Sequence, residues 1–459
     1  MQLKSPLIRK FFKYAIPTVL SGWIYAAYTL IDGIFIGRYV GETALAAFNL
    51  IVPMLSIAYA ISLMVGIGGS TMVSRMLGEK NPKQAQALFT QAFYLLIVLG
   101  LGLSAIFGFG AGFLAHQLGA TDELYPLAKN YLEIIAIFNT FATLGYALEL
   151  FLRVDGAAHV GMYAFAFGGI VNISLDYLFI VLLQWGMIGA AFATGISYGI
   201  AALVMVNYHF KYAKVVRFCK DAFKFGNKWY EMSFNGSSEF LGELAPAVSL
   251  SIFNYVILKE YGKDGIVAFA ILEYLTLATV ITLVALVQSM QPIISYENGA
   301  RNLKNMRAIF RFGLIIVFSL ALISVIIILT QSKTLFHLFI PDGNPDSLEL
   351  LSSVVFWYAI AAVPASINLA IAGYFTAIEA PLRSMIIALA RSWVLLLGAI
   401  WIGVMLFGGQ SIWYSLLVAE MLTLIISISL LYKQRKLENK NFMVPSEHSF
   451  SLVKDHAGD

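Results

Sequence analysis

Residues 41–89 contain the pattern Gly41…Ala47-Phe48…Gly78…Asn81…Phe89, and it recurs 221 positions later as Gly262…Ala268-Phe269…Gly299…Asn302…Phe310. Each copy has the same surroundings: a polar turn, a long apolar run, and then a basic loop with Gly and Asn. Self-similarity at a fixed offset in an apolar chain predicts two halves with the same architecture. In a membrane, two such halves place a substrate at their interface and favour a rocking motion about it.

The composition indicates that a lipid bilayer surrounds most of the chain. Of 459 residues 59% are hydrophobic and only 12% are charged, and the mean hydropathy is +0.80. A soluble protein of this length needs more polar surface. About twelve apolar runs reach the roughly 20 residues that a spanning helix requires. They lie near 11–36, 45–76, 87–115, 127–152, 158–183, 187–210, 238–259, 265–292, 308–331, 348–377, 382–407 and 411–432.

These runs predict an all-α membrane protein with twelve transmembrane helices. Six runs lie on each side of a polar segment, so we expect two pseudo-symmetric six-helix bundles in a V around a central cavity. The expected divisions are an N-terminal bundle at 1–210, a cytoplasmic linker at 211–236, a C-terminal bundle at 237–432 and a cytoplasmic tail at 433–459.

The distribution of Lys and Arg predicts the orientation. If the amino terminus is cytoplasmic, inside segments hold 24 of the 30 basic residues and outside loops hold five. This bias favours a multi-pass protein of the inner, cytoplasmic membrane with both termini in the cytoplasm. The basic loops then face anionic lipid headgroups, and no nucleic-acid partner is expected. The only cysteine, Cys219, is expected to be a reduced thiol in the linker.

The motifs of ATP hydrolysis and of enzyme catalysis are missing from the sequence. No phosphate-binding G-x-x-x-x-G-K-[ST] occurs, since Gly262-Lys263 is followed by Asp264. The six histidines are scattered, with no H-E-x-x-H and no Cys/His cluster. We therefore expect no enzyme, no cofactor and no metal centre beyond a coupling cation.

A few ionisable residues lie inside the apolar runs. A carboxylate at the bilayer centre costs on the order of 3 kcal/mol, so each one needs a reason. The four-residue step from Asn172 to Asp176 puts both side chains on one helical face. With Asp32 and Thr194 they supply two carboxylates, an amide oxygen and a hydroxyl, which suit a hard cation such as Na⁺. Two neighbouring carboxylates also suit a proton, because both cannot ionise cheaply. The alternative is a buried hydrogen bond between helices, with Asp32 at the membrane interface.

At these residues the chain resembles the MATE family of multidrug and toxic compound extrusion transporters, closest to the DinF/MepA-like branch. The likeness covers roughly residues 10–432. It rests on several short motifs, and their order along the chain is more specific than any one motif. The pieces are DGIFIGR at 32–38, GGSTMVSRMLGEKN at 68–81, Arg153 with Gly156, and QPIISYENGARN at 291–302.

The resemblance implies a coupling site for H⁺ or Na⁺ in the N-terminal bundle. The family pattern has an Asp in helix 1, an Asn-x-x-x-Asp in helix 5 and a Thr in helix 6, which land on Asp32, Asn172, Asp176 and Thr194. Ala190 falls where the family lends a backbone carbonyl. Within the first run, Pro17 predicts a bend of the helix.

The second half departs from the pattern of the NorM-like branch, which carries an acid pair on helices 7 and 10. Helix 10 of this chain has no acid in mid-run, only Glu379 near its cytoplasmic end. Helix 7 supplies Glu239 and Glu243, and helix 8 supplies Glu273. We take Glu243 and Glu273 as candidates for attracting a cationic substrate, with internal pairing as the alternative.

Two further charges are expected to pair within the protein. Glu149 and Arg153 are four apart on one helix and predict an intrahelical ion pair. Arg391 needs a partner if it faces the bundle interior, and Glu420, Glu379 or a helix carbonyl could serve.

The function we expect is antiport: a monomer in membrane lipid that exports amphipathic organic cations in exchange for H⁺ or Na⁺. Aromatic walls and a carboxylate suit such cargo. One alternative is a flippase for lipids or lipid-linked precursors from the same superfamily, which usually has a cationic cavity. The other is a non-transport membrane protein, either a channel or an intramembrane enzyme.

Overall fold

The computed structural model describes residues 5–339 and 345–443, and this part of the chain is almost entirely helical. The first half contains α1 (Ser5–Phe35), α2 (Glu42–Gly78), α3 (Pro82–Gln117), α4 (Tyr125–Val154), α5 (Ala158–Asp176) and α6 (Gly186–Lys211). Short π-helical segments extend α1 (η1, Ile36–Val40) and α5 (η2, Tyr177–Leu182).

The short helix α7 (Trp229–Asn235) precedes the second half. That half contains α8 (Ser237–Gly299), α9 (Leu303–Phe339), α10 (Pro345–Ile360), α11 (Ala362–Ala377), α12 (Pro381–Leu389), α13 (Leu395–Phe407) and α14 (Ile412–Met443). The π-helical η3 (Ala390–Val394) joins α12 to α13, and the 3₁₀ turn η4 (Gly409–Ser411) precedes α14.

Eleven helical segments of the described residues are long and apolar enough to cross a membrane. One of them, α8, is long enough to cross it twice. The 63-residue α8 is interrupted at Gly262, whose φ of 63° is not helical. Phe253 and Phe269, one on each side of this glycine, stack with their ring centroids 5.3 Å apart. The two halves of α8 therefore form a hairpin, and the prediction of twelve spanning helices is confirmed.

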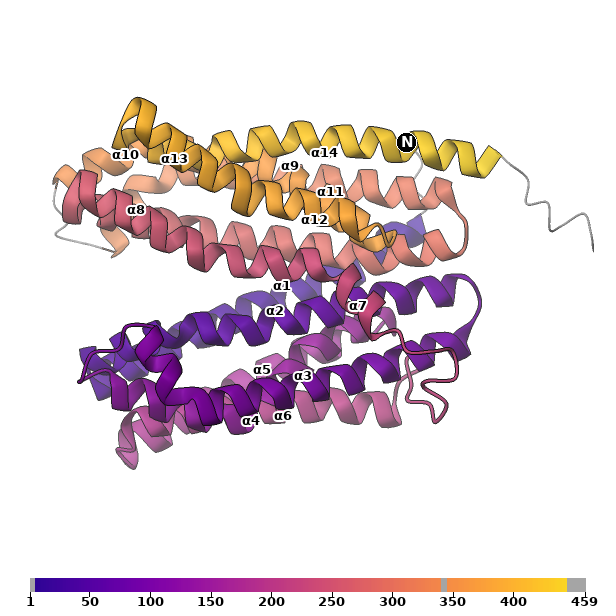
Figure 1. Cartoon of the computed structure of the whole chain (residues 1–459), viewed down its shortest axis with the longest axis horizontal. Coiled ribbons are helices and arrows are strands. Elements are labelled where there is room, and N and C mark those ends of the chain that lie inside the picture. Colours follow the sequence, from indigo (N-terminus) through magenta and orange to yellow (C-terminus); the bar gives the residue numbers. More distant parts are fainter. Residues whose placement is uncertain (1–4, 340–344, 444–459) are drawn as a thin grey trace, which may run out of the picture.

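The helices form two bundles that lie side by side (Figure 1). One bundle holds α1 to α6 and the other holds α8 to α14. They are closest on the side that carries α7 and lie farther apart on the opposite side (Figure 1). We call the α7 end, with residues 212–228 and the loops after Gly78 and Gly299, the linker side.

The repeated residues take equivalent structural roles in both halves. Gly41 and Gly262 have positive φ, 119° and 63°, in the turn between the first two helices of each half. A side chain disfavours this backbone region, which explains the glycine. The side chains of Asn81 and Asn302 each accept a hydrogen bond from the backbone N–H three residues later, at 3.2 Å. Both asparagines thus cap the third helix of their half.

The third repeated position, Gly78 and Gly299, lets the two bundles touch backbone to backbone. A Cβ on Gly78 would lie 2.1 Å from the carbonyl oxygen of Tyr296. A Cβ on Gly299 would lie 2.1 Å from the carbonyl oxygen of Arg75. Since Arg75 and Tyr296 are also 221 positions apart, the contact is reciprocal. The internal repeat thus builds a pseudo-twofold crossing of α2 and α8.

The start of α1 packs with the second bundle and not only with its own. Leu7, Phe11 and Tyr14 are buried in one apolar cluster with Met290 and Phe310. The helix continues unbroken through Pro17. Its later part packs against α5 in the first bundle, so α1 contributes to the interior of both bundles.

Two polar groups attach the linker to the first bundle. The Asp155 carboxylate accepts hydrogen bonds from the backbone N–H groups of Val215 and Val216, at 2.7 and 2.9 Å. The Gln91 amide donates to the carbonyls of Ala222 and Gly226, at 2.6 and 2.9 Å. These contacts fix where the chain leaves α6 for α7.

We expect Gly78→Ala to weaken the crossing of α2 and α8. A methyl group there has no room, and overpacking of this kind costs about 1–3 kcal/mol. Thermal unfolding of the purified protein in detergent should show a lower midpoint. Gly102→Ala on α3 is the control, because nothing lies within 4 Å of its added Cβ. Equal midpoints for the two variants would contradict a tight crossing.

Candidate functional site

Three helices of the first bundle bring together the four residues that the sequence predicted as a coupling site. Asp32 comes from α1, Asn172 and Asp176 from the last turns of α5, and Thr194 from α6. All four side chains are buried, with exposed fractions from 0 to 5%. Asp32 lies close enough to Asp176 and Thr194 to interact with both. The spacing on α5 thus produces one polar cluster inside an apolar bundle.

The backbone near Asp176 is irregular. The α-helical part of α5 ends at this residue, and a π-helical turn, Tyr177–Leu182, follows directly. Insertions of this type widen a helix and are frequent at functional sites. Ala190, the predicted carbonyl donor, is fully buried on α6 one turn before Thr194. Ala190 is therefore buried on the same helix as Thr194, as the predicted set of site residues requires.

The polar cluster is not satisfied by hydrogen bonds within the described part of the protein. Buried atoms without a partner include one carboxylate oxygen of Asp32, both of Asp176, both side-chain polar atoms of Asn172, and the hydroxyls of Thr194 and Tyr131. An unsatisfied buried polar atom costs about 1–3 kcal/mol. A proton or a small cation bound here would satisfy these atoms.

The donor set limits which cation could bind. No three His, Cys, Asp or Glu side chains come together as a metal site among residues 5–339 and 345–443. The cluster holds two carboxylates, an amide oxygen and hydroxyl oxygens. These are ligands for a hard monovalent cation or acceptors for a proton.

The cluster opens into a cavity of about 240 Å³ within the first bundle. Asp32, Asn172 and Thr194 line one part of it. The remaining wall is rich in aromatic residues, and we call it the tyrosine cavity for its six tyrosines, Tyr25, Tyr28, Tyr59, Tyr131, Tyr146 and Tyr198. Several of these rings meet edge to face: Tyr25 lies 5.2 Å from Tyr28, and Tyr59 lies 4.9 Å from Tyr146. Tyrosine rings present negative π-faces and suit an organic cation.

One acid of the tyrosine cavity comes from the other bundle. Glu243, on α8, lines the same cavity as Asp32 and is half-buried. Glu273, our second candidate for substrate binding, is not among the lining residues and accepts a hydrogen bond from the Tyr358 hydroxyl. The structure therefore places Glu243 in the wall of the cavity that Asp32 also lines, and leaves Glu273 elsewhere on α8.

Several acids inside the second bundle have hydrogen-bond partners. Arg391, in the π-helical η3, donates to the Glu420 carboxylate at 2.6 Å. The Asn368 amide donates to the other oxygen of that carboxylate at 2.7 Å. Glu239 accepts a hydrogen bond from Gln291 at 3.1 Å. Glu420 is thus the partner of Arg391 that the sequence left open.

The predicted pair of Glu149 and Arg153 is confirmed as an ion pair within α4. Arg153 also donates to the Gln288 amide oxygen on α8 at 3.2 Å. This residue therefore links the two bundles as well as its own helix.

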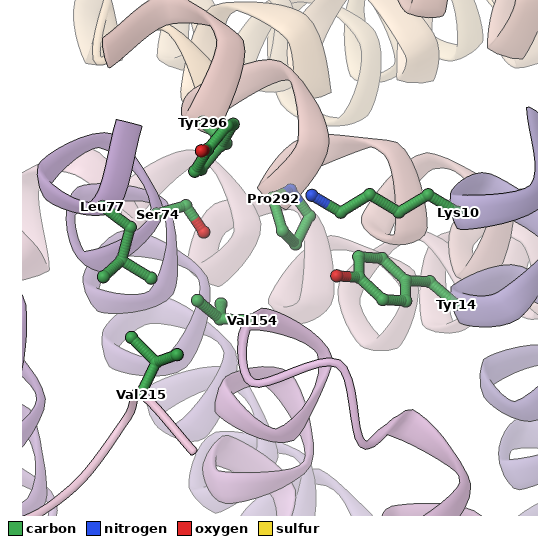
Figure 2. Close-up of a pocket in the computed structure, with 8 residues that line it drawn as sticks. All are labelled: Lys10, Tyr14, Ser74, Leu77, Val154, Val215, Pro292 and Tyr296. Carbon is green, nitrogen blue, oxygen red and sulfur yellow. The ribbon is translucent and has the colours of Figure 1, made fainter. Parts of the chain in front are cut away.

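A second cavity lies on the linker side, where the bundles meet (Figure 2). It has a volume of about 300 Å³, and we call it the junction cavity. Lys10 and Tyr14 of α1, Ser74 of α2, Val215 of the linker and Tyr296 of α8 contribute to its wall. Figure 2 shows the amine of Lys10 extended toward Pro292.

Comparison with known proteins identifies the family. The MatE profile matches residues 17–178 and 243–402, which together are more than half of the chain. The chain belongs to the MatE family. The two matched segments fall in the two bundles, as the internal repeat requires.

Curated relatives of this MatE protein align over nearly its whole length. The multidrug export protein MepA of Staphylococcus saprophyticus is 22% identical over 438 residues, covering 94% of this chain and 95% of the relative. MepA of Staphylococcus aureus is 24% identical over 433 residues, with the same coverage.

Solved structures share the fold at lower identity. A crystal structure of MATE in complex with MaL6 matches with a TM-score of 0.87 and 21% identity, covering 94% of this chain and 97% of that one. A MOP superfamily transporter from Pyrococcus furiosus, described as having a binding pocket of reverse polarity, matches with a TM-score of 0.87 and 20% identity, covering 94% and 96%. These likenesses show the fold, and a shared fold does not determine the cargo.

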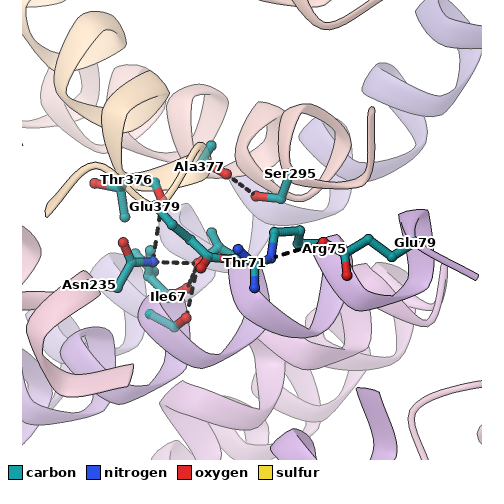
Figure 3. A network of polar contacts seen from close by, with 10 residues as sticks. Ile67, Thr71, Arg75, Glu79, Asn235, Ser295, Thr376, Ala377 and Glu379 are labelled. Atoms are coloured by element: carbon teal, nitrogen blue, oxygen red, sulfur yellow. Dashed lines mark hydrogen bonds and ion pairs between the residues drawn. The ribbon is translucent and has the colours of Figure 1, made fainter. Parts of the chain in front are cut away.

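Polar contacts close the linker side of the MatE fold around the glycine crossing, and we call them the seam network (Figure 3). Arg75 of α2 forms an ion pair with Glu379, just after α11, at 3.0 Å. The Asn235 amide donates to the Thr71 hydroxyl at 2.8 Å and to the Thr376 carbonyl at 3.3 Å. These bonds join α2, α7 and α11, so the bundles are held together on this side.

Because the Glu379 carboxylate is mostly buried, its charged form is stabilised mainly by the Arg75 guanidinium. Its side chain is 18% exposed, and burial raises its pKa, while the Arg75 guanidinium acts in the opposite direction. Glu79 also lies near Arg75, at 3.5 Å, and raises the Glu379 pKa further. The pair is a cross-bundle contact that pH and mutation can both perturb.

The sequence analysis missed the tyrosine cavity and the seam network. A signal for the first existed, because Tyr25, Tyr28 and Asp32 recur at spacings that put them on one face of α1. The partners in the seam network come from segments about 140 to 300 positions apart. No local pattern could pair them.

We expect Arg75→Ala to destabilise the protein more than Glu379→Gln. Removing the cation leaves a mostly buried carboxylate unpaired, at a cost of about 1–2 kcal/mol, whereas the amide removes the charge itself. With its folded pKa raised, Glu379 favours folding at low pH, and this advantage falls as pH rises through that pKa. Unfolding midpoints of Arg75→Ala should therefore deviate more from wild type at pH 8 than at pH 5.

Two controls test this expectation. Arg75→Ala combined with Glu379→Gln should remove the extra pH dependence. Lys129→Ala disrupts an exposed pair with Glu133, at 3.6 Å, and should change stability by less than about 0.5 kcal/mol. A loss at pH 5 as large as at pH 8 would contradict the role of Glu379.

Proposed function

We propose that this protein is a secondary active multidrug exporter that moves amphipathic organic cations outward in exchange for H⁺ or Na⁺. The observation that carries the proposal is the tyrosine cavity. Its wall contains the buried acid Asp32, six tyrosines, and one acid from the opposite bundle, and a second buried acid, Asp176, lies beside Asp32. Family membership and the MepA relatives, named as multidrug export proteins, support the same function.

We assign coupling to the first bundle because, within the described part of the chain, its buried carboxylates Asp32 and Asp176 have no cation in contact with them. Glu420, in the second bundle, is bound by Arg391 and Asn368. A guanidinium stays charged at any physiological pH, so this carboxylate has a permanent counter-ion. Asp32 and Asp176 have none among the described residues.

The ion we favour is H⁺. One proton shared between Asp32 and Asp176 needs no further ligand, whereas Na⁺ demands a fuller shell of oxygens. Asn172, Thr194 and the Ala190 carbonyl would complete such a shell if Na⁺ binds. Transport in the absence of Na⁺ decides between them.

Exchange follows if the two cations compete for one cavity. A substrate beside Asp32 and Glu243 gains from their negative charge, and a proton on Asp32 removes part of that gain. Binding of a proton from outside then favours substrate release. The cycle requires no covalent chemistry, and we assign no enzymatic activity.

The seam network and the glycine crossing represent one end state of the transport cycle. Substrate entry from the linker side requires that the contacts of Arg75 and Asn235 break, and entry from the other side does not. The basic residues of the linker and of the loops after α2 and α8 favour the cytoplasm for this side, with both termini inside. We propose a monomer as the transporting unit, since each chain carries both bundles.

We expect Asp32→Asn and Asp176→Asn each to abolish gradient-driven efflux. Each change removes one of the two groups that can exchange a proton while keeping nearly the same volume. Efflux of a fluorescent cation from proteoliposomes should be measured under separately imposed H⁺ and Na⁺ gradients. Glu133→Gln is the control, because that acid is exposed and outside the cavity. Normal rates in both Asp variants would refute the coupling assignment.

Glu243→Gln should weaken the binding of organic cations by about tenfold and leave neutral analogues unchanged. A carboxylate in a partly desolvated cavity contributes about 1–2 kcal/mol to a bound cation. Fluorescence titrations with cationic, neutral and anionic amphiphiles of similar size provide the measurement. The matched variant is Glu273→Gln, which lies on the same helix outside the cavity and should have a smaller effect.

Two results would redirect the proposal. Preference for an anionic lipid phosphate would replace drug export by the flippase function. Downhill flux without exchange would indicate a channel.

A further inference from the structure

Three basic side chains near the start of α1 surround open space on the linker side. Arg9, Lys10, Lys13 and Tyr14 line a cavity of about 480 Å³. It adjoins the junction cavity, because Lys10 and Tyr14 line both. All charged residues that line either cavity are basic. The efflux proposal uses none of them.

These cations have no acidic partner in contact with them within the described residues. No ion pair there includes Arg9, Lys10 or Lys13. Glu297 acts on Lys10 through space, but it is buried, accepts a hydrogen bond from Asn305 at 3.1 Å, and lines neither cavity. Asp155, which acts on Tyr14, is bound by linker N–H groups and by the Tyr208 hydroxyl at 2.7 Å. Positive charge is therefore in excess at this place.

The geometry around Lys10 favours an anion with an apolar part. Its amine lies 4.8 Å from the ring centroid of Tyr296 on α8 and is held half-buried. Pro292 lies near this amine, and Leu77 and Val154 form apolar wall elsewhere in the same cavity (Figure 2). A free inorganic ion would use the amines and leave this wall without a partner.

The depth of these basic residues relative to the membrane indicates which kind of anion could reach them. A candidate membrane span begins at Pro6, so Arg9, Lys10 and Lys13 lie at one end of the spanning part of α1. Headgroups of membrane lipids lie at this level, and basic pockets between helices bind anionic headgroups.

We propose that the junction cavity and the basic cavity beside it form a binding site for the phosphate headgroup of an anionic phospholipid. The phosphate contacts Lys10 and Lys13, and the glycerol and first acyl carbons lie against the apolar wall. Because the wall comes from α1, α2, α4 and α8, the bound headgroup touches both bundles. It therefore stabilises the conformation in which the linker side is closed.

The test uses the full-length protein in a non-ionic detergent. Its unfolding midpoint is titrated with phosphatidylglycerol, with phosphatidylcholine of the same chains, and with inorganic phosphate. Phosphatidylglycerol should raise the midpoint saturably, and the other two should not. Lys10→Ala with Lys13→Ala should weaken the apparent affinity at least about tenfold, since each basic residue contributes about fivefold.

Matched variants separate a built site from general attraction to lipid. Lys83→Ala with Lys304→Ala removes two exposed charges from the first turns of α3 and α9 on the same side and should leave the affinity unchanged. Lys10→Arg keeps the charge and should keep binding. If the double variant unfolds without lipid, Lys13→Ala alone can be tested instead, because this residue is exposed. Its apparent affinity for phosphatidylglycerol should be about fivefold lower.

Three outcomes would overturn the proposal. An equal loss in the control pair would reduce the effect to net charge. Equal stabilisation by phosphatidylcholine would remove the role of the phosphate charge. Saturable stabilisation by inorganic phosphate at the same affinity would assign the site to a soluble anion.

Discussion

The contact between the backbones of α2 and α8 is the constraint on which the other cross-bundle features depend. It exists because Gly78 and Gly299 have no Cβ where each meets a carbonyl of the other helix. At this separation Arg75 reaches Glu379, and Arg153 reaches Gln288. Farther along α8, Glu243 reaches the tyrosine cavity. A wider separation of the two helices would remove the seam, the cross-bundle hydrogen bond and the shared cavity together.

The two bundles are similar in backbone and different in electrostatics. Both contain a π-helical insertion in the fifth helix of the half, η2 after Asp176 and η3 around Arg391. In the first bundle the insertion adjoins acids without partners, and in the second it presents a guanidinium to Glu420. The repeat thus supplies two equivalent backbone frames, and the side chains place buried acids without a counter-ion in the first and an ion pair in the second.

Much of this architecture could be predicted from the sequence. Hydropathy predicts twelve spans because the bilayer imposes a minimum length on each helix, and the repeat predicts two bundles. The cluster of Asp32, Asn172, Asp176 and Thr194 was also found, because a buried acid in an apolar run is rare enough to attract attention. The ion pair of Glu149 and Arg153 followed from its four-residue spacing.

The remaining features depend on distances between segments far apart in the chain. A tyrosine in an apolar run is compatible with lipid, packing or a cavity wall, and only the fold separates these roles. Glu243 and Glu273 are similar in sequence context, yet one lines the cavity and the other accepts a hydrogen bond from Tyr358. The sequence allows three kinds of partner for Arg391, and helix packing brings Glu420 to it.

Glu243 has a consequence for how this protein can diversify. The wall of the tyrosine cavity is encoded almost entirely in the first half of the chain, but this acid is encoded in the second. The charge of this cavity is therefore not set by either half alone. A chimera that joined this N-terminal bundle to the C-terminal bundle of a relative without an acid at that position would retain all six tyrosines and still present a differently charged cavity. Recombination at the linker, although it separates two complete bundles, thus changes the charge of a cavity whose wall belongs almost entirely to one of them.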